Sequence, residues 1–282
     1  MTLGKVLRIA IPTTGVVTAY VLSNNDFGFR TALNKAINPA DKAAFDRHFP
    51  RGKWDDNWDF RDPYHLIDPV KYEQADEVEK KNLIKENTAT ASRHLLLIRH
   101  GQYKMDTPDK FLTELGQEQA KIIGQRLAKS TINFDRLVMS TKNRATETAN
   151  IILKELPPQL KRISCSLLEE GPPYPPVPEL STYRPSHSEY FIEGSRIESA
   201  FRRYFHRASP EQTTDSYEVV VCHANVIRYF VCRALQFPPE GWLRISLGNC
   251  SLTWVTVRPN GRVSLKMMGD VGHLPVDKIS YS

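Results

Sequence analysis

From residue 94 onward, short apolar runs alternate with longer segments whose apolar residues recur at helical spacing. A run that is apolar throughout is typical of a strand buried on both faces. The predicted strands are 94–99, 135–140, 162–168 and 217–222, and the predicted helices are 113–127, 143–156, 188–206 and 225–235. This alternation predicts an α/β fold with a mainly parallel sheet.

The pattern changes near the carboxyl end and in one loop. Segments 251–257 and 262–267 flank Pro259-Asn260-Gly261, a sequence typical of a β-hairpin turn. Residues 171–185 are rich in proline and predict an irregular surface loop. We therefore expect a hairpin at the end of the sheet and a long loop after the predicted strand 162–168.

The amino-terminal 25 residues form a segment of their own. Residues 9–25 carry no charge, and Lys5 and Arg8 precede them. A bilayer span needs about 20 mostly apolar residues, so this stretch is borderline. We interpret residues 1–25 as a membrane anchor or targeting segment. A cleaved signal peptide and a helix outside the membrane are the alternatives.

Residues 26–92 are polar and poorly periodic, and we interpret them as a linker with short helical pieces. Within it, residues 54–59 read Trp-Asp-Asp-Asn-Trp-Asp. Tryptophans in an acidic segment outside the expected core suggest a docking peptide that buries them elsewhere. Packing against the chain's own globular part is the alternative. That part, the main domain, is expected over residues 93–282.

Composition narrows the classes of partner. The 282-residue chain is 40% hydrophobic and carries a formal net charge of +6, spread along its length. The excess favours anionic substrates or a membrane surface, and no basic tract indicates nucleic-acid binding. The cysteines lack the spacing of a metal site and are expected to be buried thiols; they are Cys165, Cys222, Cys232 and Cys250. We expect neither a metal nor a cofactor.

Two predicted strands end in histidine. Strand 94–99 runs into Arg99-His100-Gly101, and strand 217–222 runs into His223. In open α/β sheets, ligands bind outside the carboxyl edge of the strands. A single histidine at a strand end is usually structural, but two at equivalent points predict a shared site.

Two further segments end at the same predicted edge. Arg144 falls in the first turn of helix 143–156, where a cation is tolerated if it shares an anion with the free backbone N–H groups. Glu169 and Glu170 follow strand 162–168, and either carboxylate is a candidate general acid or base. On its own, each segment also fits an ordinary exposed side chain.

Together these side chains predict a phosphoryl-transfer site. Arginines bind the concentrated charge of a phosphate monoester, and an imidazole can accept the phosphoryl group covalently. A carboxylic acid can then protonate the leaving alkoxide. The cations supply the electrostatic stabilisation, so the chemistry needs no metal ion.

The order of these motifs over residues 93–282 resembles the histidine phosphatase superfamily, also called the phosphoglycerate-mutase-like family. The resemblance implies a three-layer αβα sandwich. It also implies that His100 becomes phosphorylated, with Arg99, Arg144 and His223 holding the phosphoryl oxygens. Glu170 is the implied acid and base because it directly precedes a glycine, and Glu169 is the alternative.

Residues 54–59, together with the segments 216–223 and 226–244, resemble a mitochondrial branch of Ser/Thr protein phosphatases in this family. That resemblance implies phosphoprotein substrates such as stress-signalling kinases, hydrolysed at phosphoserine, phosphothreonine or phosphohistidine. It implies an anchor in a mitochondrial membrane, the outer one in our interpretation. It also implies a homo-oligomer assembled through residues of the hexapeptide, namely Trp54, Asp55, Asn57, Trp58 and Asp59, where Asp56 replaces a usual proline.

Two other functions remain possible from the sequence. A phosphoglycerate mutase or small-molecule phosphatase is one, but this chain lacks the substrate-covering segment of the mutases and has the short loop 171–185 instead. An anchored scaffold with little phosphatase activity is the other. The anchor, linker and docking peptide favour a role in protein recruitment beside catalysis.

Overall fold

Six strands form a single sheet in the computed structural model, which describes residues 52–281. The chain divides into two units, residues 1–54 and 55–282, and all six strands belong to the second unit. They are β1 (Arg93–Arg99), β2 (Arg136–Ser140), β3 (Lys161–Cys165), β4 (Ser216–Cys222), β5 (Leu252–Val257) and β6 (Val263–Asp270). The helices of this unit are α3 (Pro63–Leu66), α4 (Pro69–Gln74), α5 (Glu77–Glu86), α6 (Glu114–Ala128), α7 (Asn143–Glu155), α8 (His187–Tyr204) and α9 (Ala224–Ala234).

The strand order is β3-β2-β4-β1-β5-β6. The first four strands are parallel, and β5 and β6 are antiparallel to their neighbours, so the predicted mainly parallel sheet is confirmed. The predicted hairpin is also confirmed, with its turn closed from Arg258 N to Arg262 O at 2.9 Å. In the β1–β4 register, Arg99 lies opposite Cys222. This register places the residues after both strands at one edge of the sheet.

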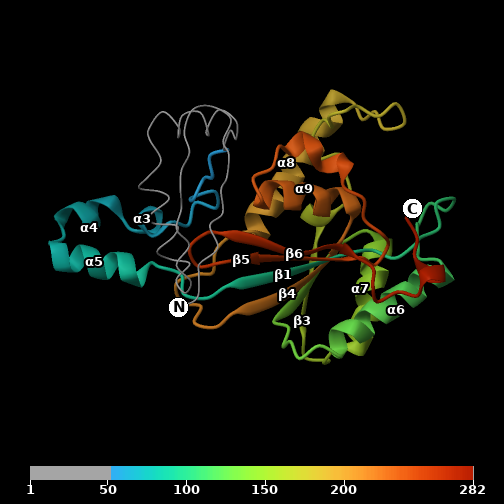
Figure 1. Ribbon diagram of the computed structural model, residues 1–282, viewed down its shortest axis with the longest axis horizontal. Coiled ribbons are helices and arrows are strands. Elements are labelled where there is room, and N and C mark those ends of the chain that lie inside the picture. Colours follow the sequence, from blue (N-terminus) through green and yellow to red (C-terminus); the bar gives the residue numbers. More distant parts are fainter. Residues whose placement is uncertain (1–51, 282) are drawn as a thin grey trace, which may run out of the picture. The chain divides into compact units, whose positions relative to one another are not determined.

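Helices cover the two faces of the sheet and give the three-layer sandwich that the family resemblance implied (Figure 1). Alternate residues of β1 and β4, such as Leu96 and Val219, pack with Ile123 of α6 and Ile152 of α7 in one buried cluster. Helices α8 and α9 lie on the opposite face (Figure 1). Because both faces are covered, all seven residues of β1 are buried.

One strand is shorter than its pattern predicts. The sequence predicts a strand over 162–168, but β3 ends at Cys165 and a 3₁₀ turn follows over Ser166–Leu168. β3 pairs with β2 alone and is mostly exposed, whereas Leu168 is fully buried. The chain leaves the edge of the sheet to bury that leucine, and this turn sets the direction of the glutamates that follow.

The proline-rich loop 171–185 is irregular, as predicted, and it is fastened to the 3₁₀ turn Pro239–Arg244. Trp242 Nε1 donates to Tyr174 O at 2.7 Å, Val177 N donates to Glu240 O at 2.9 Å, and Arg244 Nε donates to Val177 O at 2.8 Å. The loop is therefore a fixed wall of the domain rather than a free segment.

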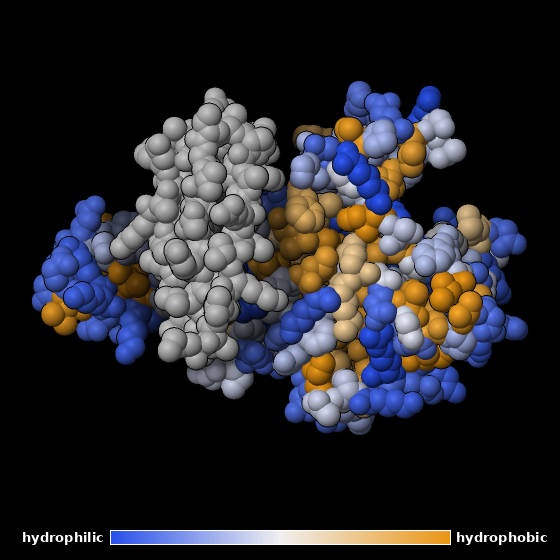
Figure 2. Space-filling model, in the orientation of Figure 1, coloured by the Kyte–Doolittle hydropathy of each residue, from blue (hydrophilic) through white to orange (hydrophobic). Residues whose placement is uncertain are grey.

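Residues 55–92 differ from the linker that their polar composition predicts. Helices α3, α4 and α5 each begin with an aspartate cap, and together they bury a small core of Ile67, Ala75 and Leu83. Hydrophilic side chains predominate on the surface of α4 and α5 (Figure 2). The whole segment belongs to the same unit as the sheet, so the domain begins before the predicted boundary at residue 93.

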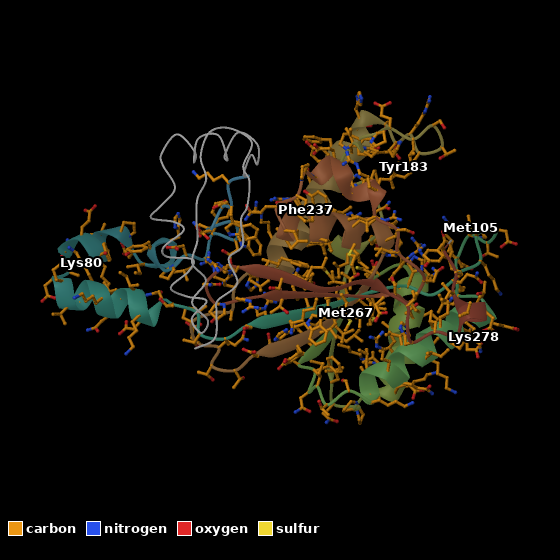
Figure 3. The ribbon with its side chains drawn as sticks, in the orientation of Figure 1. Lys80, Met105, Tyr183, Phe237, Met267 and Lys278 are labelled. Atoms are coloured by element: carbon orange, nitrogen blue, oxygen red, sulfur yellow. The ribbon has the colours of Figure 1, made fainter. Side chains whose placement is uncertain are left out.

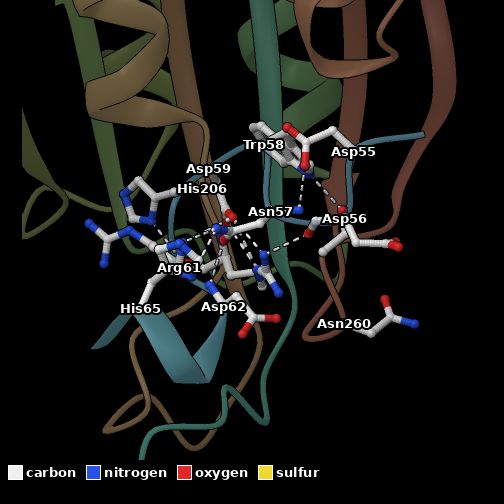
Figure 4. A network of polar contacts seen from close by, with 12 residues as sticks. Asp55, Asp56, Asn57, Trp58, Asp59, Arg61, Asp62, His65, His206 and Asn260 are labelled. Atoms are coloured by element: carbon white, nitrogen blue, oxygen red, sulfur yellow. Dashed lines mark hydrogen bonds and ion pairs between the residues drawn. The ribbon is translucent and has the colours of Figure 1, made fainter. Parts of the chain in front are cut away.

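The second half of the tryptophan hexapeptide packs on the chain's own domain (Figure 4). The indole of Trp58 is buried, its Nε1 donates to Gly261 O at 2.8 Å, and its ring lies 5.8 Å from that of Phe201. Asp59 is buried against Arg207, whose NH2 donates to Asp59 Oδ1 at 2.7 Å. Trp58 and Asp59 therefore follow the alternative interpretation, in which the hexapeptide packs against the chain's own globular part and does not dock on another surface.

The remaining hexapeptide residues are less enclosed. Asp55 is exposed and its backbone N donates to Gln236 Oε1 at 2.8 Å, whereas Asn57 is half-buried. The division between the two units falls directly after Trp54. We name the contacts of Trp58 and Asp59 with Gly261, Phe201 and Arg207 the hexapeptide seat.

Two further expectations concern the cysteines and the anchor. All four cysteines are free and buried, as predicted. Among residues 52–281, no helix combines the length and apolarity needed to cross a bilayer. The predicted anchor at residues 1–25 lies outside the described residues.

Candidate active site

The two strand-end histidines meet at the carboxyl edge of the sheet, as their positions predicted. His100 N donates to Cys222 O at 3.0 Å, which extends the β1–β4 ladder by one residue. His223 follows Cys222 at the start of α9, and the two imidazole centroids lie 5.1 Å apart. Both side chains are buried.

The hydrogen bonds of His100 fix the position of its ring proton. Nδ1 lies 2.8 Å from Gly101 O, and a carbonyl oxygen only accepts, so Nδ1 carries the proton. Nε2 accepts from Arg144 Nε at 3.1 Å and therefore keeps its lone pair. His100 is thus held as a neutral imidazole whose unprotonated nitrogen faces the arginine.

Burial lowers the pKa of His100 well below its usual value, and Arg144 and Arg99 lower it further. The neutral form therefore persists at physiological pH, and a neutral imidazole is the form that can attack phosphorus.

Close backbone packing holds this segment in place. A Cβ on Gly101 would lie 2.5 Å from Gly116 O, and Gly116 itself packs against the backbone of Gln102. The start of α6 thus presses directly on the residues after β1, and only glycine fits at either position.

The two predicted arginines are both buried and are held differently. Arg99 NH1 donates to Leu247 O at 2.6 Å. Arg144 lies in the first turn of α7, with its guanidinium 4.9 Å from the centroid of the Tyr103 ring. The cap of α7, Lys142, makes no side-chain capping bond, which leaves the helix start suited to an anion.

Ser140, at the end of β2, holds His223. Ser140 Oγ lies 2.8 Å from His223 Nε2, and Lys142 N donates to the same oxygen at 3.3 Å. Among residues 52–281, Nε2 is the one acceptor within reach of the Ser140 hydroxyl, so we assign the hydroxyl proton to Nε2, which places the His223 ring proton on Nδ1. His223 Nδ1 has no hydrogen-bond partner among the described residues, so it is a donor available to a ligand.

The structure separates the two adjacent glutamates. Glu169 forms an ion pair with Lys142 at 2.9 Å and accepts from the hydroxyl of Thr141. Partial burial raises the pKa of Glu169, but those two partners outweigh it and hold the pKa below its usual value. Glu170 instead lines the cavity beside His100, and its Oε1 is enclosed without a hydrogen-bond partner among residues 52–281.

Burial raises the pKa of Glu170, although Arg144, Arg99 and Arg228 oppose the rise. A carboxyl with a raised pKa beside a candidate nucleophile has the property that a general acid requires. This placement favours Glu170 over Glu169 as the acid.

His100, Glu170 and His223 bring one ligand atom each within 4.8 Å of one another, a spacing that could also hold a metal ion. The charge of the surroundings argues otherwise. Arg99, Arg144 and Arg228 line the same cavity, and three guanidinium groups repel a dication and attract an anion.

The cavity has a volume of about 340 Å³. Sequence reasoning missed several of its lining residues, which are Tyr103, Ala224, Asn225, Arg228, Ser246, Leu247 and Tyr281. The spacing of two polar residues three apart near the start of helix α9, Asn225 and Arg228, was a signal for part of this set. Leu247, in the loop before β5, and Tyr281, near the carboxyl end, reach the cavity through long-range packing, which no local pattern reports.

A family model described as the histidine phosphatase superfamily (branch 1) matches residues 95–170 and 181–270. A relative from Caenorhabditis elegans, "Serine/threonine-protein phosphatase Pgam5, mitochondrial", is 58% identical over 282 residues, which is 99% of each chain. The Mus musculus relative "Serine/threonine-protein phosphatase PGAM5, mitochondrial" is 50% identical over 236 residues, which is 82% of each chain. The solved structure of Bacillus stearothermophilus YhfR matches with a TM-score of 0.50 and 20% identity, over 64% of this chain and 98% of that one. The YhfR match concerns the fold alone.

Proposed function

The chain belongs to the histidine phosphatase superfamily, and on that premise we propose that it is a protein-serine/threonine phosphatase acting through a covalent phosphohistidine at His100. The observation that carries the proposal is the hydrogen bonding of His100. Its Nδ1–H donates to Gly101 O, and its Nε2 accepts from Arg144. The substrate class rests on the relatives, whose names describe serine/threonine-protein phosphatases.

In the first step, His100 Nε2 attacks the phosphorus of a phosphoserine or phosphothreonine, and the bond from phosphorus to the side-chain oxygen breaks. Glu170, in its protonated form, gives its proton to that oxygen. Arg99, Arg144 and the Nδ1–H of His223 hold the three remaining phosphoryl oxygens and stabilise their charge in the transition state. Arg144 turns from Nε2 to the phosphoryl group as the substrate enters.

In the second step, the Glu170 carboxylate takes a proton from a water molecule, whose oxygen attacks the phosphohistidine. The phosphorus–nitrogen bond breaks, inorganic phosphate leaves, and His100 and protonated Glu170 are restored. One carboxyl group thus serves as acid and then as base. The same chemistry would act on phosphohistidine, with nitrogen as the leaving atom.

We also propose that the protein works in mitochondria. Residues 1–25 anchor it in a membrane, which is the outer membrane in our interpretation. The names of the relatives support the organelle. Protease treatment of intact mitochondria, with and without rupture of the outer membrane, tests the membrane side. Full protection before rupture would contradict a domain exposed on the outer surface.

Homo-oligomer formation through residues 54–59 is a further proposal. The hexapeptide seat supports it, because a seat that buries an indole and a charged pair can take the same segment from a second copy. Sedimentation of the Trp58→Ala variant tests the idea: we expect smaller assemblies, and an unchanged distribution would contradict it.

Phosphate release from a phosphothreonine peptide by the full chain, with chelator present, tests the phosphatase proposal. We expect turnover that His100→Ala abolishes while the variant keeps its thermal unfolding midpoint, because His100 is placed for chemistry. During turnover with a radiolabelled peptide, we expect a protein-bound label that is stable to alkali and labile to acid. Turnover retained in His100→Ala would contradict the nucleophile, and inactivity of the assembled wild type would favour the anchored scaffold.

A further inference from the structure

The cavity holds more positive charge than a phosphoryl group alone requires. Arg99, Arg144 and Arg228 line it, and Glu170 is its carboxylate. When Glu170 is protonated for the first step, three positive charges face a dianionic phosphoryl group. One positive charge is then left to be balanced by another part of the substrate.

Arg228 is the arginine best placed to carry that remaining charge. Arg144 contacts the nucleophile His100 directly, and Arg99 directly precedes it along β1. Arg228 comes from the second turn of α9, and it forms no ion pair with any residue of the described chain. Its NH1 donates to Asn225 Oδ1 at 3.1 Å. Its Nε is enclosed and lacks a hydrogen-bond partner among residues 52–281.

The surroundings of Arg228 form a fixed part of the cavity. Asn225 Nδ2 lies 3.4 Å from both Gly171 O and Tyr183 Oη, which joins α9 to the proline-rich loop. Tyr183 packs edge-on against Trp242 at 5.8 Å between ring centroids and is labelled in Figure 3 near the start of α8. The neighbouring Arg184 is exposed and adds positive charge to this side of the site.

We infer that Arg228 is the anion-binding residue of a second subsite, which takes the carboxylate of an acidic residue next to the phosphorylated serine or threonine. This inference rests on the proposed phosphatase function and names its substrate class: phosphopeptides with acidic neighbours. A half-buried guanidinium held by Asn225 can bind a carboxylate through two parallel hydrogen bonds with little loss of side-chain entropy.

The test compares two phosphothreonine peptides that differ only in having aspartate or alanine on each side of the phosphothreonine. For the full chain we expect kcat/KM to be about tenfold higher for the aspartate peptide, because solvent reduces the strength of the carboxylate–guanidinium pair in a half-buried site. The preference should shrink as salt is raised. In Arg228→Gln the ratio should fall to about one, and in Arg228→Lys an intermediate ratio should remain because the charge is kept without the planar fork.

Arg162→Gln is the matched control, since Arg162 is an exposed arginine on the edge strand β3 and lies outside the cavity. It removes the same charge from the protein and should keep the tenfold ratio. Unfolding midpoints of all variants check that Arg228→Gln is folded, and Arg228→Lys provides the second variant if it is not.

The outcomes separate the subsite from the phosphatase function itself. If neither peptide nor p-nitrophenyl phosphate is hydrolysed, the proposed phosphatase function fails. If both peptides are hydrolysed at equal kcat/KM, the phosphatase stands and the subsite is overturned. An equal loss for both peptides in Arg228→Gln overturns it as well, because the residue would then act on the phosphoryl group. The subsite is also overturned if Arg228→Gln shifts the pH profile of kcat/KM equally for both peptides, because Arg228 would then act through Glu170.

Discussion

Removing the carboxylate of Asp59 should destabilise the domain strongly, although the residue lies outside the sheet. The side chains of Asp59 and Arg207 are 0% and 4% exposed. Arg207 donates to Asp59 from its backbone N at 2.7 Å, from Nε at 3.1 Å and from NH2 at 2.7 Å. The Asp59→Ala change therefore leaves a buried guanidinium whose remaining hydrogen bond, among residues 52–281, goes to Asp56 O at 2.8 Å.

Breaking a buried ion pair by removing one partner costs about 3–5 kcal/mol. For a domain of this size each kcal/mol lowers the midpoint by about 2–4 °C, so we expect a fall of about 6–20 °C. Differential scanning calorimetry measures it. The exposed Asp55→Ala is the matched control and should shift the midpoint little. Adding Arg207→Met to Asp59→Ala should recover part of the loss, because the orphaned charge is then gone.

A midpoint unchanged in Asp59→Ala would refute the reasoning, since it would mean that the seat is not filled in solution. Protein concentration separates two ways of filling it. When the chain's own segment fills the seat, the fall is the same at every concentration. When a second copy supplies the segment, the wild-type midpoint itself rises with concentration.

The other predictions concern the reaction. Glu170→Gln should lower kcat for a phosphothreonine peptide by about 10²–10⁴-fold. With p-nitrophenyl phosphate, whose leaving group needs no acid, the variant should still become phosphorylated, and without the Glu170 carboxylate to activate water the phosphorylated protein should be visible by mass spectrometry. A protein that stays unmodified would contradict this assignment. Ser140→Ala should lower kcat/KM about tenfold for every substrate, because the His223 ring proton is no longer directed to Nδ1; equal activity in steady-state assays would remove Ser140 from the site. Burial lowers the pKa of His100, so the rate at which His100 is phosphorylated should not fall when the pH is lowered from about 7 to 6. Rapid-mixing assays measure this rate. A fall in the rate centred near the usual histidine pKa would contradict a neutral, buried nucleophile.

The convergence of His100 and His223 was predictable because it follows from topology. Two parallel strands with apolar runs must bring their carboxyl ends to one edge, whatever the loops between them do. Arg144 was predictable for the same reason, since the first turn of the helix after a parallel strand starts at that edge. The register of Arg99 opposite Cys222 confirms the placement.

The sequence could not decide between Glu169 and Glu170. Both lie after β3, in an irregular segment with no side-chain period, and their directions depend on the turn that buries Leu168. Arg196 then holds the backbone of that segment, with NH1 donating to Leu167 O at 2.7 Å. A contact between α8 and a loop some thirty residues away leaves no mark in the local pattern.

The tryptophan hexapeptide shows a different limit. The sequence of the hexapeptide predicts burial, because two tryptophans in an acidic segment need a partner surface. The sequence does not predict which surface buries them. In this structure Arg207 binds Asp59 and Gly261 accepts from Trp58. The sequence around Arg207 and Gly261 does not show whether the hexapeptide that binds them comes from the same chain or from a second copy.

The order in which the active site is made during synthesis follows from the antiparallel end of the sheet. The proposed nucleophile His100 follows the first strand, but its neighbours from the loop before β5 are made much later: Leu247 accepts from Arg99, and Asn249 Nδ2 donates to His100 O at 3.3 Å. Ser280 holds Asn249 in turn, and Tyr281 lines the cavity. A nascent chain therefore carries the proposed nucleophile through the synthesis of β2 to β6 without the groups that complete the site. Ribosome-bound chains that have not yet emerged through residue 281 should be unable to dephosphorylate the proteins around them.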